Sequence, residues 1–460
     1  METKTDLLDF QREAVMKLRK LKVGALYMDT GTGKTRVALE LAKIRIDADK
    51  IDKVIWLCPT SEQVKTNLID DFNKHTIGWE NIIVLCGIET LSSSVKENYR
   101  LLDLSKNQRC FLVVDESLLI KNPYTLRSKN ITRIAKQCTY KIILNGTPIS
   151  RNYADLFSQW YILDWRILGY QSYWSFAANH LEYDENTHKV RRVLNVDYLT
   201  DKIAPYTIQI SKKEVAHLPQ KLYSTFYFTL TNEQKAHYEF VLDDFLSMET
   251  LLQNPDSPLI YRTFTALQQV VSGRCITSRA NLPITHEPMF SNPLDNPRIQ
   301  ALLNSIDTYV PSNEKCIIWC RYTHEIDDIK RVLTDLGESF TLCYGKITKR
   351  RRREVKREFE NSARFLIANK SCGAFSSNLQ FSHYAIFYNN DWNWGTRIQA
   401  EDRQDRIGQT TNPHAIDICA KSTIDERILS CLNNKSDMEK EFKKTVGKKS
   451  LRDWINGKDV

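Results

Sequence analysis

The sequence has no apolar run near the ~20 residues that a helix needs to cross a bilayer. Its first thirty residues lack the apolar core and small-residue cleavage site of a secretory signal. We therefore expect an intracellular protein without a membrane partner. Its compartment would be the cytoplasm of a bacterial or phage-infected cell, or the nucleus of a eukaryotic one.

The eleven cysteines lack the paired close spacings of a zinc site. The closest pair, Cys316 and Cys320, lies in the apolar run CIIWC, which is typical of a buried strand. The sequence also lacks a repeat of about 20 to 50 residues and any low-complexity tract apart from charge runs. These absences predict reduced structural thiols and disfavour a metal cluster.

With 460 residues, 42% of them apolar, the chain can build two or three cores. The formal charge of +9 makes an anionic partner such as nucleic acid plausible without establishing it.

Two series of short β-rich runs alternate with helical stretches, which is the pattern of parallel sheets with crossover helices. The first series comprises 23–28, 53–58, 82–86, 110–116 and 141–146, and the second 315–320, 339–345, 364–370, 384–390 and 415–420. We predict an α/β fold with two lobes and helical insertions between them. The expected parts are a first lobe at 1–150, a helical insertion with a hairpin at 151–218, a helical insertion and linker at 219–295, a second lobe at 296–435 and a basic tail at 436–460.

A glycine-rich turn separates the first strand from a helix-forming run, with Met28 where the full phosphate-loop signature has its first glycine. Its glycines let backbone N–H groups surround a phosphate, and the helix N-terminus adds partial positive charge. The lysine is expected to reach the β and γ phosphates and the second threonine to ligate Mg²⁺. The pattern favours an ATP site over an ordinary turn, and its residues are Thr30, Gly31, Thr32, Gly33, Lys34 and Thr35.

Four apolar residues deliver Asp115 and Glu116 to the carboxyl edge of the same sheet. Asp115 would hold Mg²⁺, and Glu116 would orient and deprotonate the attacking water. An acidic pair after a strand is common, so this prediction depends on the loop upstream.

Further motifs resemble those of the Swi/Snf-type branch of the superfamily-two helicases. In chain order they are Phe10-Gln11, Asp115 to Asn122, Leu144 to Ile149, Asp155 to Phe157, Gln399 to Gln409 and Ser422 to Glu426. The resemblance implies two RecA-like lobes that hydrolyse ATP between them, adenine recognition by Gln11, and coupling by Gly146 and Thr147.

The sixth motif supplies Arg403 and Arg406, with Gln399 at its start. Residues three apart share one face of a helix. Their guanidinium groups can stabilise the negative charge that spreads over the phosphoryl oxygens in the transition state. We expect these three residues to be catalytic. The alternative is a pair of arginines making surface ion pairs with Glu401, Asp402 and Asp405.

Two motifs depart from the family's pattern. Leu118 stands where a polar coupling residue is usual, and the fifth motif, 371–379, keeps only part of its glycine-rich pattern. The paired arginines usual near 209 are also not evident. Coupling between the lobes must then use other residues.

Residues 346–357 read KITKRRRREVKR, and Val355 and Phe359 form the apolar stripe of a helix there. Its cations could bind successive phosphates of a nucleic acid without sequence specificity. A solvated helix face or a localisation signal would have a similar composition. The family places a DNA contact at this turn. The DNA-binding residues that we expect are Thr60, Lys346, Thr348, Arg350, Arg351, Arg352, Arg353, Lys370 and Ser371.

These motifs together predict an ATP-dependent DNA helicase or translocase that acts on duplex or branched DNA, with replication or recombination proteins as partners. A turn at 184–187 between two β-capable arms, 181–194, predicts a hairpin that could separate strands at forks or junctions. The alternative for this segment is a surface hairpin packed on the helical insertion. The alternatives are a duplex translocase that displaces proteins without unwinding, an RNA helicase, and an ATP-dependent switch that is not a motor.

Overall fold

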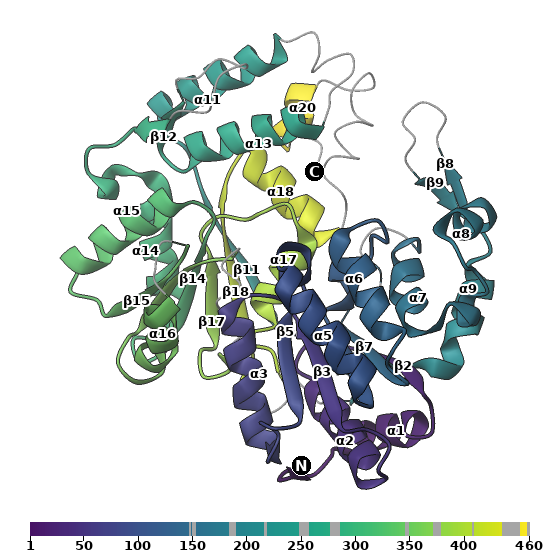
Figure 1. Ribbon diagram of the computed structural model, residues 1–460. Coiled ribbons are helices and arrows are strands. Elements are labelled where there is room, and N and C mark those ends of the chain that lie inside the picture. Colours follow the sequence, from purple (N-terminus) through teal and green to yellow (C-terminus); the bar gives the residue numbers. More distant parts are fainter. Residues whose placement is uncertain are drawn as a thin grey trace. The chain divides into compact units, whose positions relative to one another are not determined.

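The chain divides into two units, Met1–Leu218 and Pro219–Val460, and each contains a six-stranded parallel sheet. The computed structural model describes residues 1–146, 149, 153–183, 190–215, 219–247, 257–276, 286–345, 349–370, 379–406, 409–434 and 451–457. Figure 1 shows helices on both faces of each sheet. The two parallel sheets with their crossover helices confirm the predicted α/β class.

The sheet of the first unit has the order β10-β2-β7-β6-β3-β5. Its strands are β2 (Val23–Met28), β3 (Lys53–Cys58), β5 (Ile83–Gly87), β6 (Cys110–Asp115), β7 (Tyr140–Asn145) and β10 (Thr207–Ile210). Its helices are α1 (Asp9–Leu18), α2 (Lys34–Asp47), α3 (Glu62–His75), α4 (Thr90–Ser93), α5 (Val95–Asn107), α6 (Leu126–Ala135), α7 (Asp155–Leu168), α8 (Tyr173–His180), α9 (Val196–Ile203) and α10 (Lys212–Val215). Shorter elements are β1 (Glu2–Thr3), β4 (Thr76–Ile77), β8 (Leu181–Tyr183), β9 (Val190–Val193) and the 3₁₀ turns η1 (Ser117–Ile120) and η2 (Ala204–Tyr206).

The sheet of the second unit has the order β11-β18-β17-β14-β16-β15. Its strands are β11 (Leu222–Phe228), β14 (Cys316–Cys320), β15 (Phe340–Cys343), β16 (Phe365–Asn369), β17 (Tyr384–Phe387) and β18 (His414–Ala420). Its helices are α11 (Asn232–Leu246), α13 (Ser257–Val271), α14 (Pro297–Tyr309), α15 (Thr323–Asp335), α16 (Lys349–Asn361), α17 (Trp394–Glu401), α18 (Ile424–Asn433) and α20 (Leu451–Ile455). Shorter elements are β12 (Arg274–Ile276), β13 (His286–Pro288) and η3 (Pro293–Asp295).

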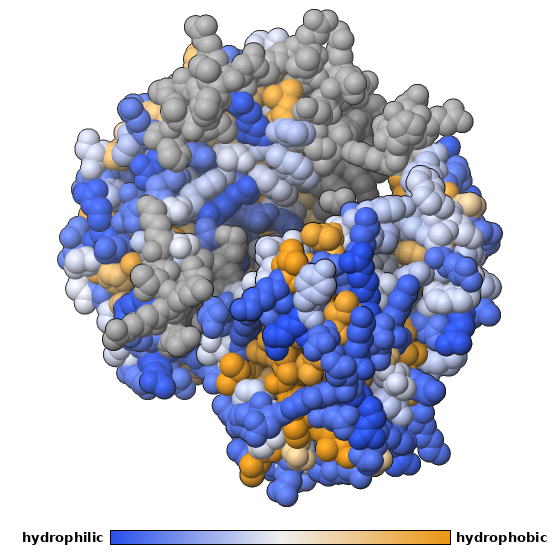
Figure 2. Space-filling view, viewed as in Figure 1, coloured by the Kyte–Doolittle hydropathy of each residue, from blue (hydrophilic) through white to orange (hydrophobic). Residues whose placement is uncertain are grey.

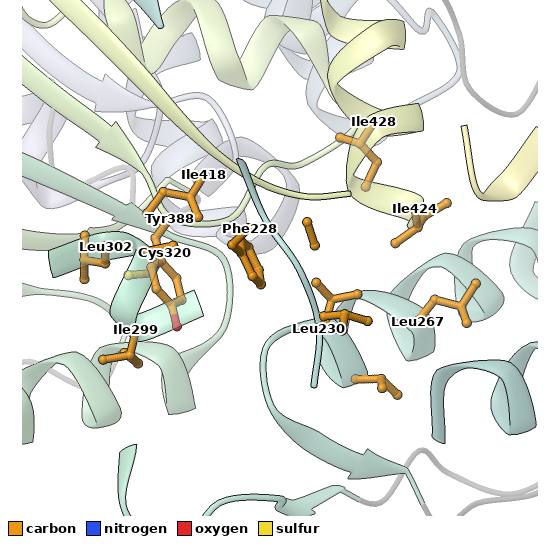
Figure 3. Close-up of a cluster of buried hydrophobic side chains, with 14 of the residues drawn as sticks. Phe228, Leu230, Leu267, Ile299, Leu302, Cys320, Tyr388, Ile418, Ile424 and Ile428 are labelled. Carbon is orange, nitrogen blue, oxygen red and sulfur yellow. The ribbon is translucent and has the colours of Figure 1, made fainter. Parts of the chain in front are cut away.

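Each sheet is buried on both faces, because alternate residues of its strands enter different cores. In β2, Ala25 and Tyr27 join one hydrophobic cluster, and Leu26 and Met28 join the other. In β14, Ile318 lies in the larger cluster of the second unit, which Figure 3 shows around Phe228 and Leu267. Double burial explains why these strands read as continuous apolar runs.

Each of the ten predicted strands is present, but two edge strands were not predicted. β10 pairs with β2, and β11 pairs with β18, both in parallel. The expectation of helical insertions alone between the lobes is therefore incomplete. Both strands are partly exposed edge strands, which lack the continuous apolar runs that mark the central strands.

The end of the expected basic tail packs on the second unit. Trp454 and Ile455 of α20 are buried, and Arg427 Nε donates to Trp454 O at 2.7 Å.

No helix among the described residues is both long and apolar enough to span a membrane.

Candidate active site

The glycine-rich turn joins β2 to α2 as predicted. Gly31 and Gly33 both have φ of +86°, a left-handed conformation that glycine adopts without strain. A Cβ on Gly33 would lie 2.3 Å from Gln11 Nε2, so any larger residue here would displace this side chain. The two glycines therefore set both the curvature of the loop and the space for the glutamine.

Gln11 contacts the loop from helix α1. Its side chain is buried, its Nε2 donates to Thr32 O at 2.9 Å, and its Oε1 accepts from Leu8 N at 3.1 Å. The structure thus brings together two motifs that are about twenty residues apart in the sequence.

Lys34 begins α2 and points back across the end of β2. Its Nζ donates to Met28 O at 2.7 Å and to Asp29 O at 3.3 Å. Burial lowers the pKa of Lys34, while the carboxylates of Glu116 and Asp115 oppose that shift. Lysine and both acids therefore form one electrostatic cluster at the carboxyl edge of the sheet.

The acidic pair lies where β6 ends. Burial, and then the charge of Glu116, raises the pKa of Asp115 to about 7. Glu116 is exposed at a φ of +56°, and its N–H donates to Asp115 Oδ1 at 3.1 Å. Removing water from one carboxylate and placing a second beside it favours a cation or a proton here.

A buried network connects the acidic motif with the third motif. Ser117 Oγ donates to Gln159 Oε1 at 2.6 Å, and Asn145 Nδ2 donates to Ser117 Oγ at 3.5 Å. A Cβ on Gly146 would lie 3.7 Å from Thr30 Oγ1, so this expected coupling residue borders the glycine-rich turn. Thr147, the other one, lies outside the described residues.

Lys212 is a site residue that sequence reasoning did not select. Its backbone N–H donates to Asp29 Oδ2 at 2.9 Å, its side chain is buried, and its charge acts to lower the pKa of Lys34. β10 places it there by pairing with β2. The signal in the sequence is a lysine pair just after the β-capable run TIQI, near the position where the family usually has paired arginines.

Arg403 and Arg406 do not share a helix face, because α17 ends at Glu401. That prediction was wrong, and both arginines lie in the turn that follows. Their carbonyl oxygens accept from Leu379 N and Gln380 Nε2, each at 2.9 Å. The backbone of Leu379 and the side chain of Gln380 thus link this turn to the neighbouring segment. Gln399 is exposed on α17 itself.

The acids of the sixth motif surround Lys221. Its Nζ lies 3.1 Å from Asp405, 3.3 Å from Glu401 and 3.7 Å from Asp402. Burial acts to lower the pKa of Lys221, but these three carboxylates outweigh that effect and raise the pKa above its usual value. Sequence reasoning missed this residue, since it lies 180 positions from Glu401.

Thr60, an expected DNA contact of the first unit, has other partners. Its N–H donates to Glu89 Oε2 at 2.7 Å, and its Oγ1 accepts from the N–H groups of Glu89 and Thr90 at 3.0 and 3.2 Å. These bonds close the loop after β3 against the loop after β5. The threonine therefore shapes this edge of the sheet.

The basic helix of the second unit forms where it was predicted. Val355 and Phe359 are buried, which confirms the apolar stripe of α16, and Arg351 pairs with Glu358 and Glu354. Lys346, Thr348 and Ser371 lie outside the described residues, as do the side chains of Arg350, Arg352 and Arg353.

Lys370 follows β16 and lies among polar and aromatic neighbours. Its Nζ donates to Asn390 Oδ1 at 3.4 Å and lies 5.3 Å from the centre of the Phe387 ring. Burial, and then the charge of Arg397, lowers the pKa of Lys370 to about 7.

Comparison with known proteins gives the family context. Residues 26–271 match the model of the SNF2-related domain, and residues 298–408 match the helicase conserved C-terminal domain. The chain is 28% identical over 379 residues to "Putative ATP-dependent helicase/translocase YwqA" of Bacillus subtilis, covering 81% of this chain and 39% of that protein. It is 25% identical over 368 residues to "Uncharacterized ATP-dependent helicase MG018" of Mycoplasma genitalium, covering 79% of this chain and 33% of that protein.

The chain thus spans about two fifths or less of the length of these curated relatives. Among solved structures it is similar to the Sulfolobus solfataricus SWI2/SNF2 ATPase core in complex with dsDNA. The identity is 23% and the TM-score 0.43, over 98% of this chain and 94% of that one. On the match of the family model over more than half of its length, this chain belongs to the SNF2-related family, with a helicase conserved C-terminal domain in its second unit.

Proposed function

We propose that this chain is an ATP-dependent motor on DNA. The observation that carries the proposal is the cluster of Lys34, Asp115 and Glu116 at one sheet edge, behind a glycine-rich turn. Family membership and the names of the relatives, ATP-dependent helicase or translocase, support the same activity. In this proposal the glycine backbone and Lys34 bind the phosphates of ATP, and Gln11 sets the position of the turn.

Glu116 would act as the general base. It is exposed at the end of β6, so a water can reach its carboxylate, while the neighbouring Asp115 is held by burial and by the Glu116 N–H. Arg403 and Arg406 of the second unit would then stabilise the charge on the phosphoryl oxygens. ATP turnover would depend on both units, which is how hydrolysis could be converted into movement.

The residues present fit a magnesium ion. A carboxylate such as Asp115, whose pKa is raised to about 7 by desolvation and a second acid, is stabilised in its charged form by a divalent cation. Asp115 and Thr35 would hold the ion. Mg²⁺ would neutralise charge on the β and γ phosphate oxygens when bound.

The test is whether DNA raises the ATPase rate. Turnover is measured with duplex, single-stranded, forked and four-way DNA and with duplex RNA, each at several salt concentrations. A DNA motor predicts stimulation by DNA that weakens with salt, because phosphate contacts release counterions. Equal rates with and without nucleic acid would favour a switch, and stronger stimulation by RNA would favour an RNA helicase.

A strand-separating hairpin is the finer part of the proposal. β8 and β9 pair antiparallel and extend from α8 (Figure 1), while the turn at 184–189 lies outside the described residues. His180 anchors their base: its Nδ1–H donates to Leu194 O at 3.0 Å, and its Nε2 accepts from the Tyr170 hydroxyl at 2.9 Å. A rigid base suits a wedge that meets duplex ahead of a motor.

The hairpin is tested by replacing Glu182 to Val193 with a short Gly-Ser turn. If it separates strands, the variant keeps DNA-stimulated ATPase and loses unwinding of forks or branch migration of junctions. If both activities persist, strand separation does not use the hairpin. If neither form of the protein unwinds DNA but both displace a bound protein, the chain is a duplex translocase.

A further inference from the structure

The first unit carries an apolar groove that the ATP site does not use. It is a cavity of about 250 Å³ between α5 and α6, floored by α4. Its walls include Leu102 and Ile134, and Val95, Tyr99 and Leu126 stand at its edges. Figure 2 shows apolar side chains breaking the hydrophilic surface over this part of the unit.

The apolar residues at the edges of the groove are largely exposed to solvent. Val95 and Tyr99 are each 70% exposed, and Leu126 is 54% exposed. On α5 the residues Val95, Tyr99 and Leu102 recur at spacings of four and three, so they form a second apolar stripe besides the one that is buried. A contiguous exposed apolar surface marks an interaction site.

The floor of the groove is polar and firmly held. Asn98 Nδ2 donates to Leu91 O at 3.1 Å, and Asn130 Nδ2 donates to the same carbonyl at 2.8 Å. The Oδ1 atom of Asn98 is buried and accepts no hydrogen bond from the described residues.

One rim of the groove is basic. Lys129 and Arg133 lie on the exposed side of α6 and Lys136 directly follows that helix, at spacings of four and three, and no ion pair with other described residues forms at any of them. The sequence contains no acid from 117 to 154. Lys96 adds an exposed cation on α5. This field favours an acidic partner.

We propose that the groove binds an acidic amphipathic helix of a partner protein. The apolar face of such a helix would enter between α5 and α6, and its carboxylates would pair with Lys129, Arg133 and Lys136. A nucleic acid would use the cations but not the apolar walls, so the combination favours a protein. This interface is independent of the DNA motor proposed above.

The probe is a synthetic 18-residue helix with leucines at i, i+3, i+4 and i+7 and glutamates on its other positions. Its matched control carries lysine at every glutamate position. Binding of each labelled peptide to the full chain is followed by fluorescence anisotropy. The acidic peptide should bind at least about tenfold more tightly than the basic one, because apolar burial is common to both and only the charge differs.

Variants separate the apolar and charged contributions. Tyr99→Ser and the double variant Arg133→Glu with Lys136→Glu should each weaken the acidic peptide about tenfold or more, whereas Lys50→Glu, an exposed charge change elsewhere, should not. Ser92→Trp fills the cavity and should block binding with all cations retained. Basal ATPase and the thermal midpoint check that each variant is folded.

Equal binding of the two peptides, or binding that survives Ser92→Trp, would overturn the proposal. So would a charge-reversed variant that loses affinity for duplex DNA while Tyr99→Ser has no effect on any ligand, since α6 would then be a nucleic-acid surface. Neither result depends on whether the chain proves to be a motor.

Discussion

Lys221 Nζ lies 3.1 Å from Asp405, inside the acidic stretch that carries Arg403 and Arg406. The same ammonium lies near Glu401, whose carboxylate also accepts from the Tyr223 hydroxyl at 2.9 Å. Residue 221 comes just after the boundary between the two units. One lysine therefore ties the start of the second unit to the turn that holds both arginines.

The Lys221→Met variant would leave the nearly buried carboxylates of Glu401 and Asp405 without their ammonium partner, so they would pair with neighbouring guanidinium groups instead. Because this would displace Arg403 and Arg406 from the phosphoryl oxygens, kcat should fall on the order of 10² with little change in the KM for ATP. Steady-state ATPase measures the split. Lys221→Arg should restore turnover, and Lys235→Met, an exposed change, is the control. A change in KM alone would contradict this role.

Lys34→Ala should abolish ATP hydrolysis, because it removes the lysine of the phosphate loop. Its side chain donates to backbone carbonyls of the same loop, so the fold should be retained. ATPase turnover and circular dichroism are the measurements. A folded variant with full turnover would place the ATP site elsewhere.

Glu116→Gln should keep ATP binding and lose hydrolysis, since an amide can orient water but cannot take its proton. Nucleotide binding is measured by calorimetry and hydrolysis by phosphate release. The exposed change Glu13→Gln serves as the control. If binding disappears together with hydrolysis, Glu116 has a structural role.

Arg403→Ala and Arg406→Ala should each lower turnover by roughly 10³ to 10⁵, the range for arginines that stabilise phosphoryl transfer. Nucleotide affinity should change much less. Arg331→Ala, on the exposed side of α15, is the matched control. Unchanged turnover in both variants would mean that the second unit does not complete the reaction.

Neutralising Arg350 to Arg353 should weaken DNA binding and flatten its salt dependence by about one unit of slope for every DNA phosphate that the protein no longer neutralises. Arg351 already pairs with Glu358, so its single substitution should have a smaller effect than the fourfold change. Anisotropy titrations at several salt concentrations give the slope. Neutralising the exposed Lys20, Lys50, Lys235 and Lys330 controls for total charge. An equal slope in the fourfold variant would make this run a solvated helix face.

The two parallel sheets and the cluster of Lys34 with Asp115 and Glu116 could be predicted from the order of residues alone. Central strands are buried on both faces, so their apolar runs are visible without the fold, and all ten were predictable. Each of these site residues comes shortly after such a run. Parallel strands align their carboxyl ends, and this rule brings the motifs together without knowledge of any contact.

Features that depend on a partner distant in the chain emerged only from the folded structure. The edge strand β10 is defined by pairing with β2, and that pairing brings Lys212 to the phosphate loop. Arg403 and Arg406 lie beyond the end of α17, where their carbonyls accept hydrogen bonds from residues 379 and 380. The charge of Lys221 acts on acids about 180 positions away. Such interactions follow from proximity in space, which no local pattern of residues encodes.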